Sequence, residues 1–262
     1  MSLLEIHGLS KTYRTLGRPA VRAVDDVSLT IGEGEVVGLV GESGSGKSTV
    51  LRCVMKLARP DTGRITFAGR DVVPLRGAGL RAYRQDVQMV FQDPLGSLNP
   101  RMTVEELVGE GLLVHRRMPT RARRDEVAGL LERVGMRPAE LGRHPASFSG
   151  GQLQRIAIAR ALAVGPRLLV CDEPVSALDV SVQAQVLNLL LDMRAELGLS
   201  ILFVSHDLAV VNYLCSRLYV LRSGRVVEEG SREQVFDSPN HEYTRELMAA
   251  VPDPDRALSG RA

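Results

Sequence analysis

The feature that most constrains this chain is a glycine-rich segment that lies between an apolar run and a helical pattern. It reads Gly41-Glu42-Ser43-Gly44-Ser45-Gly46-Lys47-Ser48-Thr49. The run Val36–Val40 before it has the composition of a buried strand, and the stretch Val50–Leu57 after it favours a helix. Strand, turn and helix in this order are the context that a G-x-x-x-x-G-K-[ST] phosphate loop requires. The segment therefore predicts an α/β core built around this loop.

The chemistry expected of the loop is the binding of a nucleotide triphosphate. Glycines let backbone N–H groups close around phosphates, and the helix N-terminus adds a partial positive charge. Lys47 is expected to reach the β- and γ-phosphates and to stabilise charge there, and the Ser48 hydroxyl to contact Mg²⁺. The alternative is an ordinary glycine-rich turn, but the pattern would arise by chance in only about one chain in a hundred of this size.

The composition limits the classes of protein that fit. With 262 residues, 44% hydrophobic and 24% charged, the chain can form one large α/β domain or two small ones. A net charge of +2 gives no sign of a basic face for nucleic acid. The densest basic cluster lies beside two acids and is interpreted as a solvated helix face rather than as a contact with anionic lipid or nucleic acid. Its arginines are Arg116, Arg117, Arg121, Arg123 and Arg124.

Membrane and redox signals are absent from the sequence. No apolar run approaches the roughly 20 residues that span a bilayer, and Met1–Glu5 lacks the features of a signal peptide. We therefore expect a cytosolic chain that could still act at a membrane surface. Cys53, Cys171 and Cys215 form no C-x-x-C pair and are expected to be buried free thiols. The histidines show no metal-ligand spacing.

Short β-type runs alternate with helical patterns at both ends of the chain, which predicts a mostly parallel sheet covered by helices. The expected strands are Leu3–His7, Val24–Leu29, Val36–Val40, Arg64–Phe67, Val87–Phe91, Leu168–Cys171, Ile201–Val204, Arg217–Leu221 and Arg225–Glu228. From about 94 to 165 the pattern is helical, which predicts a helical insertion with helices at Thr103–Val114, Arg121–Val134 and Gly150–Val164. Further helices are expected at Val182–Leu197 and Glu242–Val251, and the tail 252–262 is expected to be flexible.

A second motif is the apolar run Leu168–Cys171 followed by two acids. Asp172 is expected to hold Mg²⁺ through water, and Glu173 to polarise the water that attacks the γ-phosphate. By itself this pattern would only mark the end of a strand. Downstream of a phosphate loop it indicates nucleotide hydrolysis.

A third motif, Ser149-Gly150-Gly151-Gln152, opens a helix. Ser149 is the expected N-cap, and the two glycines permit close approach to a positive helix start. A capped helix with a flexible entry is the simpler alternative. Because one nucleotide does not need two such helix starts, the motif indicates half of a second site, completed by a neighbouring molecule.

With these three motifs in this order, the chain resembles the ATP-binding-cassette (ABC) ATPases from Leu3 to about Val251. The resemblance implies a P-loop NTPase core with a mostly parallel sheet, an antiparallel N-terminal β-subdomain and an inserted helical subdomain. In the family, two such domains stand head to tail with two ATPs between them. The γ-phosphate on one loop would then be contacted by the partner's signature motif, here Ser149, Gly150, Gly151 and Gln152.

The resemblance extends to single positions. Tyr13 matches the aromatic residue that stacks on adenine, although a plain surface tyrosine is the alternative. Gln92 matches the glutamine that meets Mg²⁺ and the attacking water and relays to the membrane partner. His206 matches the switch histidine on the γ-phosphate, and Asp179 the loop that crosses the dimer interface beside Glu173.

Two longer stretches, Val90–Pro100 and Ser176–Val186, and the tail Glu242-Tyr243-Thr244 resemble the ATPases of oligopeptide and dipeptide importers. Nickel, glutathione and opine systems share much of this pattern. No Cys follows Cys215, so the chain resembles the type without a C-terminal cysteine cluster. The resemblance implies ATP and Mg²⁺ as cofactors. It also implies a second ATPase subunit (a heterodimer is favoured), two membrane-spanning permeases and an extracytoplasmic solute-binding protein that acts indirectly, but no nucleic acid. The implied location is peripheral, on the cytoplasmic face of the membrane.

Other functions stay open at this point. A soluble ABC protein that acts on DNA or ribosomes is one, although such proteins usually carry two cassettes or a long coiled coil. A nucleotide-gated module of an enzyme complex is another, and the presence of both Glu173 and His206 argues against a degenerate site. Export rather than import is a third. The transported substrate cannot be read from these residues.

Overall fold

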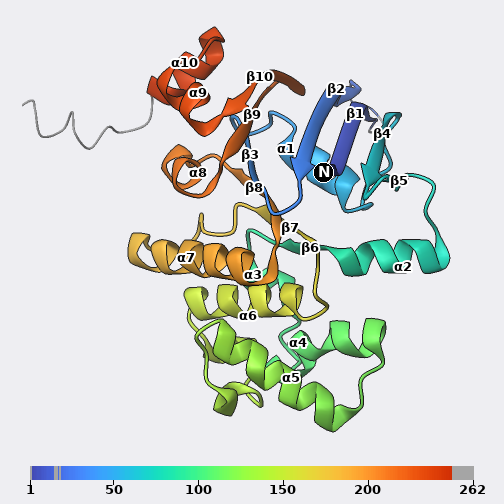
Figure 1. Cartoon of the computed structure of the whole chain (residues 1–262), viewed down its shortest axis with the longest axis vertical. Coiled ribbons are helices and arrows are strands. Elements are labelled where there is room, and N and C mark those ends of the chain that lie inside the picture. The colour runs from blue at the N-terminus through green and yellow to red at the C-terminus, as the bar shows by residue number, and fades with distance from the viewer. Residues whose placement is uncertain (1, 15–16, 18, 250–262) are drawn as a thin grey trace, which may run out of the picture.

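Two β-sheets of different kinds organise the chain (Figure 1). The computed structural model describes residues 2–14, 17 and 19–249, so the tail expected at 252–262 lies outside the described residues. The first sheet is antiparallel, with strand order β2-β1-β4-β5. The second has the order β10-β9-β3-β8-β7-β6 and is parallel except at its edge, where β10 runs antiparallel to β9. The predicted fold class, a mostly parallel core beside an antiparallel N-terminal sheet, is confirmed.

The strands are β1 (Ser2–Tyr13), β2 (Val21–Gly32), β3 (Val36–Val40), β4 (Thr62–Phe67), β5 (Arg70–Asp71), β6 (Val87–Val90), β7 (Leu168–Asp172), β8 (Ser200–Ser205), β9 (Arg217–Arg222) and β10 (Arg225–Ser231). The α-helices are α1 (Lys47–Val54), α2 (Gly77–Asp86), α3 (Pro94–Ser97), α4 (Val104–Gly111), α5 (Thr120–Arg133), α6 (Gly150–Leu162), α7 (Val180–Leu197), α8 (Leu208–Leu214), α9 (Arg232–Asp237) and α10 (Glu242–Ala249). Helix α4 continues as a π-helix, Leu112–Arg116, and short 3₁₀ turns lie at Pro138–Glu140 and Pro145–Ser147.

The central strand β3 is buried along its whole length because hydrophobic layers cover both faces of the parallel sheet. Val37 and Leu39 pack with α1 and the antiparallel sheet, whereas Val36 and Val40 pack with the helices on the other side. This alternation follows from the two-residue period of a strand. Both faces of the predicted buried strand therefore pack against hydrophobic side chains.

Between β6 and β7 the chain is helical, and no strand interrupts residues 91–167, all of which are described. Helices α4, α5 and α6 form the lower part of the molecule in Figure 1. Helix α4 begins with a capping box, in which the Glu106 N–H donates to the Thr103 hydroxyl at 3.3 Å and the Thr103 N–H donates to the Glu106 carboxylate at 2.7 Å. The arginine cluster is mostly exposed here, and Arg124 pairs with Glu105 at 3.1 Å.

The parallel register decides where the functional residues meet. Val40 lies beside Ser205, and Asp172 lies beside Val204, so β3, β7 and β8 end at one edge of the sheet. The phosphate loop follows β3 at this edge. Side chains at the carboxyl ends of adjacent parallel strands form the usual site of an open α/β sheet.

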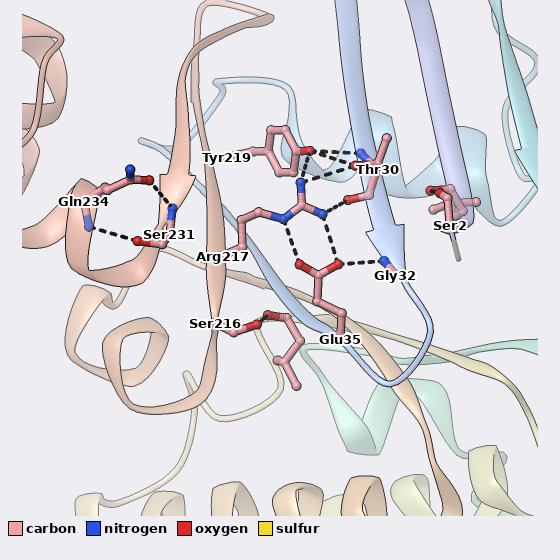
Figure 2. A network of polar contacts seen from close by, with 11 residues as sticks. Ser2, Thr30, Gly32, Glu35, Ser216, Arg217, Tyr219, Ser231 and Gln234 are labelled. Carbon is pink, nitrogen blue, oxygen red and sulfur yellow. Dashed lines mark hydrogen bonds and ion pairs between the residues drawn. The ribbon is translucent and has the colours of Figure 1, made fainter.

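An ion-pair network joins the two sheets at the opposite edge, where β3 and β9 begin (Figure 2). The Arg217 guanidinium on β9 contacts both Glu35 carboxylate oxygens, at 2.7 and 3.0 Å. It also donates to the Tyr219 hydroxyl at 2.7 Å and to the Thr30 carbonyl on β2 at 2.8 Å. Burial by itself would raise the pKa of Glu35, but hydrogen bonds from Arg217 and from the Gly32 N–H lower it. The network therefore anchors β2 of one sheet to β9 of the other.

Several elements depart from the sequence prediction. Strand β5 and helices α2, α3, α8 and α9 are not predicted by the pattern, because they are short or, as in α2, contain two glycines and bury only Tyr83. In α7, Leu187 is buried, whereas Leu197 at the end of the helix is 40% exposed. The three cysteines are buried free thiols, as expected.

Candidate active site

The phosphate loop adopts a conformation that only glycine allows at two places. Gly41 has φ 147° and Gly46 has φ 110°. A Cβ atom at Gly41 would lie 2.1 Å from the Leu221 carbonyl oxygen, and one at Gly46 would lie 2.3 Å from the Ala23 carbonyl oxygen. The loop thus packs its backbone directly on β9 and β2 before α1 begins at Lys47.

The loop forms one wall of a cavity of about 730 Å³. All nine loop residues, 41–49, line this cavity, as do Tyr13, Gln92, Glu173 and His206. The structure therefore gathers in one place every residue that the sequence predicts for ATP binding and all four that it predicts for catalysis. Ala23 and Leu247 also line the cavity, and nothing in the sequence motifs points to them.

The Lys47 side chain is buried, with 6% of the residue exposed. Its ammonium group donates to the Gly41 carbonyl at 2.5 Å and to the Glu42 carbonyl at 2.9 Å. Burial lowers the pKa of Lys47, while the negative charges of Glu173, Asp172 and Glu42 oppose that shift. The positive charge is thus held inside the loop, next to the place where phosphates would bind.

The Glu173 carboxylate lies between two polar partners from neighbouring strands. Its Oε1 is 3.0 Å from His206 Nδ1, and its Oε2 accepts a hydrogen bond from Gln92 Nε2 at 3.1 Å. Glu173 has φ 47°, in the left-handed region, and its N–H donates to the Val204 carbonyl at 2.9 Å. The backbone turn after β7 therefore directs this carboxylate to the cavity.

Of the three residues expected to hold Mg²⁺, two line the cavity and one does not. Ser48 and Gln92 line the cavity, whereas Asp172, at the end of β7, does not. Burial and the nearby charge of Glu173 raise the pKa of Asp172. Among the described residues no cluster of three His, Cys, Asp or Glu side chains could hold a metal ion. A hydroxyl, an amide and a carboxylate nevertheless suit Mg²⁺, which binds through few protein oxygens together with substrate phosphates.

The signature motif lies outside this cavity, on an exposed surface. Ser149 caps α6 through a reciprocal pair, in which the Gln152 N–H donates to the Ser149 hydroxyl at 3.4 Å and the Ser149 N–H donates to the Gln152 side chain at 3.0 Å. A Cβ atom at Gly151 would lie 2.4 Å from Val182, so α6 and α7 approach closely there. Asp179, the first residue before α7, is exposed and also lies outside the cavity.

Comparison with known proteins places this architecture in a family. The family model for ABC transporters matches residues 24–176. The oligopeptide transport ATP-binding protein OppD of Mycobacterium bovis is 51% identical over 98% of this chain, which spans only 43% of that protein. OppF of Streptococcus mutans is 48% identical over 98% of this chain and 83% of its own length. A putative peptide import ATP-binding protein of Brucella ovis is 51% identical over 97% of this chain and 80% of its own length.

Solved structures agree with this result. The dimeric post-hydrolysis state of the ATP-binding cassette MJ0796, bound to ADP and Pi, matches 88% of this chain and 99% of that one, with 32% identity and a TM-score of 0.80. The cbiO1 subunit of Clostridium perfringens matches 98% of this chain and 99% of that one, with 29% identity and a TM-score of 0.80. In the described part of the chain, no helix has the length and apolarity needed to cross a membrane. By family match, sequence identity and fold, this chain belongs to the ABC transporter family.

Proposed function

We propose that the chain is the ATP-hydrolysing subunit of an ABC importer for oligopeptides, dipeptides or a related small solute. The observation that carries this proposal is the identity of about half, over 97–98% of the chain, with proteins named for oligopeptide transport and peptide import. The cavity supplies the chemistry that such a subunit needs, because it unites a phosphate loop with a positioned carboxylate.

In this mechanism the loop N–H groups and Lys47 hold the β- and γ-phosphates and compensate the charge that develops on them. The Glu173 carboxylate takes a proton from the water that attacks the γ-phosphate. His206 and Gln92, at 3.0 and 3.1 Å, keep the carboxylate in one orientation. Tyr13, 36% exposed on the cavity wall, offers a ring face for the adenine.

The residues present fit a magnesium ion bound together with the phosphates. Ser48 and Gln92 would hold it from the cavity wall, and Asp172 would hold it through water. When bound, the ion neutralises negative charge on the phosphate oxygens. This assignment needs only oxygen ligands, in keeping with the chemistry of this cation.

A second cassette would complete the site. Ser149, Gly150, Gly151 and Gln152 and the interface residue Asp179 are wholly or partly exposed and lie away from this chain's own cavity. A head-to-tail dimer would bring them to the γ-phosphate on the partner's loop. We favour a second ATPase of different sequence as this partner.

A permease would dock beside Gln92, on the cytoplasmic face of the membrane. Residues of α2, β6, α4 and α6 line a second cavity of about 480 Å³. Exposed apolar side chains line it, since Phe91 is 38% exposed and Val114 is 47% exposed, together with the charged residues Arg84, Glu110 and Arg160. Phe91 lines this groove, and the next residue, Gln92, lines the nucleotide cavity. A membrane partner in the groove would therefore contact the residue next to Gln92.

Gentle extraction of the tagged chain from membranes of its native cell tests the proposal. We expect two multi-span permeases, a second ATPase and, ideally, a solute-binding lipoprotein to come with it. The variant Val114→Arg should lose the permeases and keep nucleotide binding, since it replaces an exposed apolar contact by a long charged side chain far from the phosphate loop. Purely soluble, nucleic-acid-bound or enzymatic partners would refute the transport proposal. The rate of ATP hydrolysis in the assembled complex would distinguish a transport motor from a nucleotide-gated module of an enzyme complex, in which little hydrolysis is expected.

A further inference from the structure

The last described helix reaches the phosphate loop from a distant part of the sequence. Tyr243 on α10 is buried, with 3% of the residue exposed, and its hydroxyl accepts a hydrogen bond from the Glu42 N–H at 3.1 Å. One turn later on the same helix, Leu247 lines the nucleotide cavity. In Figure 1, α10 lies beside α9, next to the edge strand of the parallel sheet. The C-terminal helix is thus part of the wall of the nucleotide site.

Tyr243 is held in place by the sheet that also supports the loop. The Arg222 guanidinium at the end of β9 stacks on its ring, 4.6 Å from the ring centroid. Arg222 follows Leu221, whose carbonyl faces Gly41. The end of β9 therefore contacts both the loop and the tyrosine.

The start of α10 is anchored separately. Both oxygens of the Glu228 carboxylate on β10 accept backbone hydrogen bonds, from Asn240 at 2.7 Å and from His241 at 3.1 Å. These bonds involve a charged acceptor, which makes them stronger than neutral ones. The tyrosine hydroxyl is thus presented to the loop by a fixed element and not by a loose tail.

Within the loop, Lys47 donates to the Gly41 and Glu42 carbonyls, and the Ser45 N–H donates to the Glu42 carbonyl. Contacts from outside the loop hold its two halves separately. The Gly224 N–H donates to the Ser45 carbonyl at 2.8 Å, which holds the second half of the loop on the β9–β10 turn. The Glu42 N–H has its partner in Tyr243. Without that hydroxyl, a partly buried N–H loses its acceptor, and the loop is free to shift toward another one. Binding of phosphates would then have to restore the loop's shape at a cost in affinity.

From these contacts we infer that Tyr243 is a positioning residue for the nucleotide, through which the C-terminal helix keeps the phosphate loop in its binding conformation. The inference rests on the assignment of residues 41–49 as the phosphate loop. It adds a role for α10, which lies outside the three sequence motifs. The tyrosine itself does not touch the reacting atoms.

Tyr243→Phe tests the inference, because it keeps the ring and its contact with Arg222 and removes only the hydroxyl. In the full chain, titration calorimetry with MgADP should show binding weaker by about fivefold, the equivalent of about 1 kcal/mol for one hydrogen bond. In steady-state assays the KM for ATP should rise by a similar factor, and kcat should stay within about twofold. Arg222→Gln removes the guanidinium that stacks on the Tyr243 ring, at an exposed position. It should weaken MgADP binding by a smaller factor.

Tyr83→Phe is the matched control. Tyr83 is equally buried, with 4% of the residue exposed, and its hydroxyl donates to the Val54 carbonyl at 2.6 Å, at the far end of α1. The variant Tyr83→Phe should lower thermal stability about as much as Tyr243→Phe and leave MgADP affinity unchanged. Wild-type affinity in Tyr243→Phe, or an equal loss in both variants, would overturn the inference. If the wild-type chain bound MgADP no better than Lys47→Ala, the loop assignment itself would be wrong.

Discussion

Replacement of Glu173 by glutamine separates the chemistry of the site from its architecture. The carboxylate accepts from Gln92 at one oxygen and faces His206 with the other. An amide keeps the size and one acceptor but presents an NH₂ group to one of these two donors. The lost contact should cost about 1 kcal/mol of stability. The loss of the base should lower turnover by roughly 10²–10⁴-fold.

Steady-state phosphate release by the assembled transporter measures the turnover, and calorimetry with MgATP measures the binding. We expect Glu173→Gln to bind ATP about as well as the wild type while releasing almost no phosphate. Asp207→Asn is a matched control, since Asp207 follows His206 and accepts the Ala209 N–H at 2.9 Å as a helix cap outside the cavity. It should lose some stability and keep turnover within about threefold. Turnover of Glu173→Gln near the wild-type level would refute the assigned role.

Two further substitutions probe the loop and the junction between the sheets. Gly46→Ala would place a methyl group 2.3 Å from the Ala23 carbonyl, so nucleotide affinity should fall more than about 100-fold in calorimetry. Gly44→Ala, with open space around it, should show only the strain of its φ of 80°, about 1 kcal/mol. Arg217→Ala leaves Glu35 without its partner and should lower the free energy of unfolding in urea by about 2 kcal/mol at pH 7. Because the folded pKa of Glu35 is lowered, this contribution is present above its unfolded pKa of about 4.3 and is lost as pH falls through the folded value. The difference between wild type and variant should therefore shrink at pH 3, and an unchanged difference would contradict the assignment.

Elements with a strong local signal could be predicted from the sequence. The all-apolar β3 followed by glycines and a helix is one example, and the capped start of α6 at Ser149 is another. Helices α2 and α8 could not be predicted in this way. The first contains two glycines, and the second is seven residues of mostly apolar, partly β-branched sequence that also suits a strand. Both form because the surrounding core and, for α8, the Asp207 cap stabilise them.

The individual site residues could be identified from motifs, but their mutual geometry could not. Gln92, Glu173 and His206 are separated by up to 114 positions and meet because β6, β7 and β8 are neighbours in one parallel sheet. Strand order depends on packing across the whole core, and no local pattern encodes it. The contact of Tyr243 with Glu42 is a clearer case, since 201 residues separate the two.

Local chemistry is thus what the sequence by itself determined: a loop whose glycines are required by its backbone, a lysine at a helix start, a carboxylate after a strand, and a capped signature helix. Short-range sterics and hydrogen bonding decide such features, and residue type at fixed spacing encodes them. Tertiary structure alone decided which strand ends became neighbours, that Arg217 and Glu35 tie the two sheets together, and that α10 closes the wall of the nucleotide site. Those contacts are made between segments far apart in the chain, and only the burial of a shared core brings the segments together.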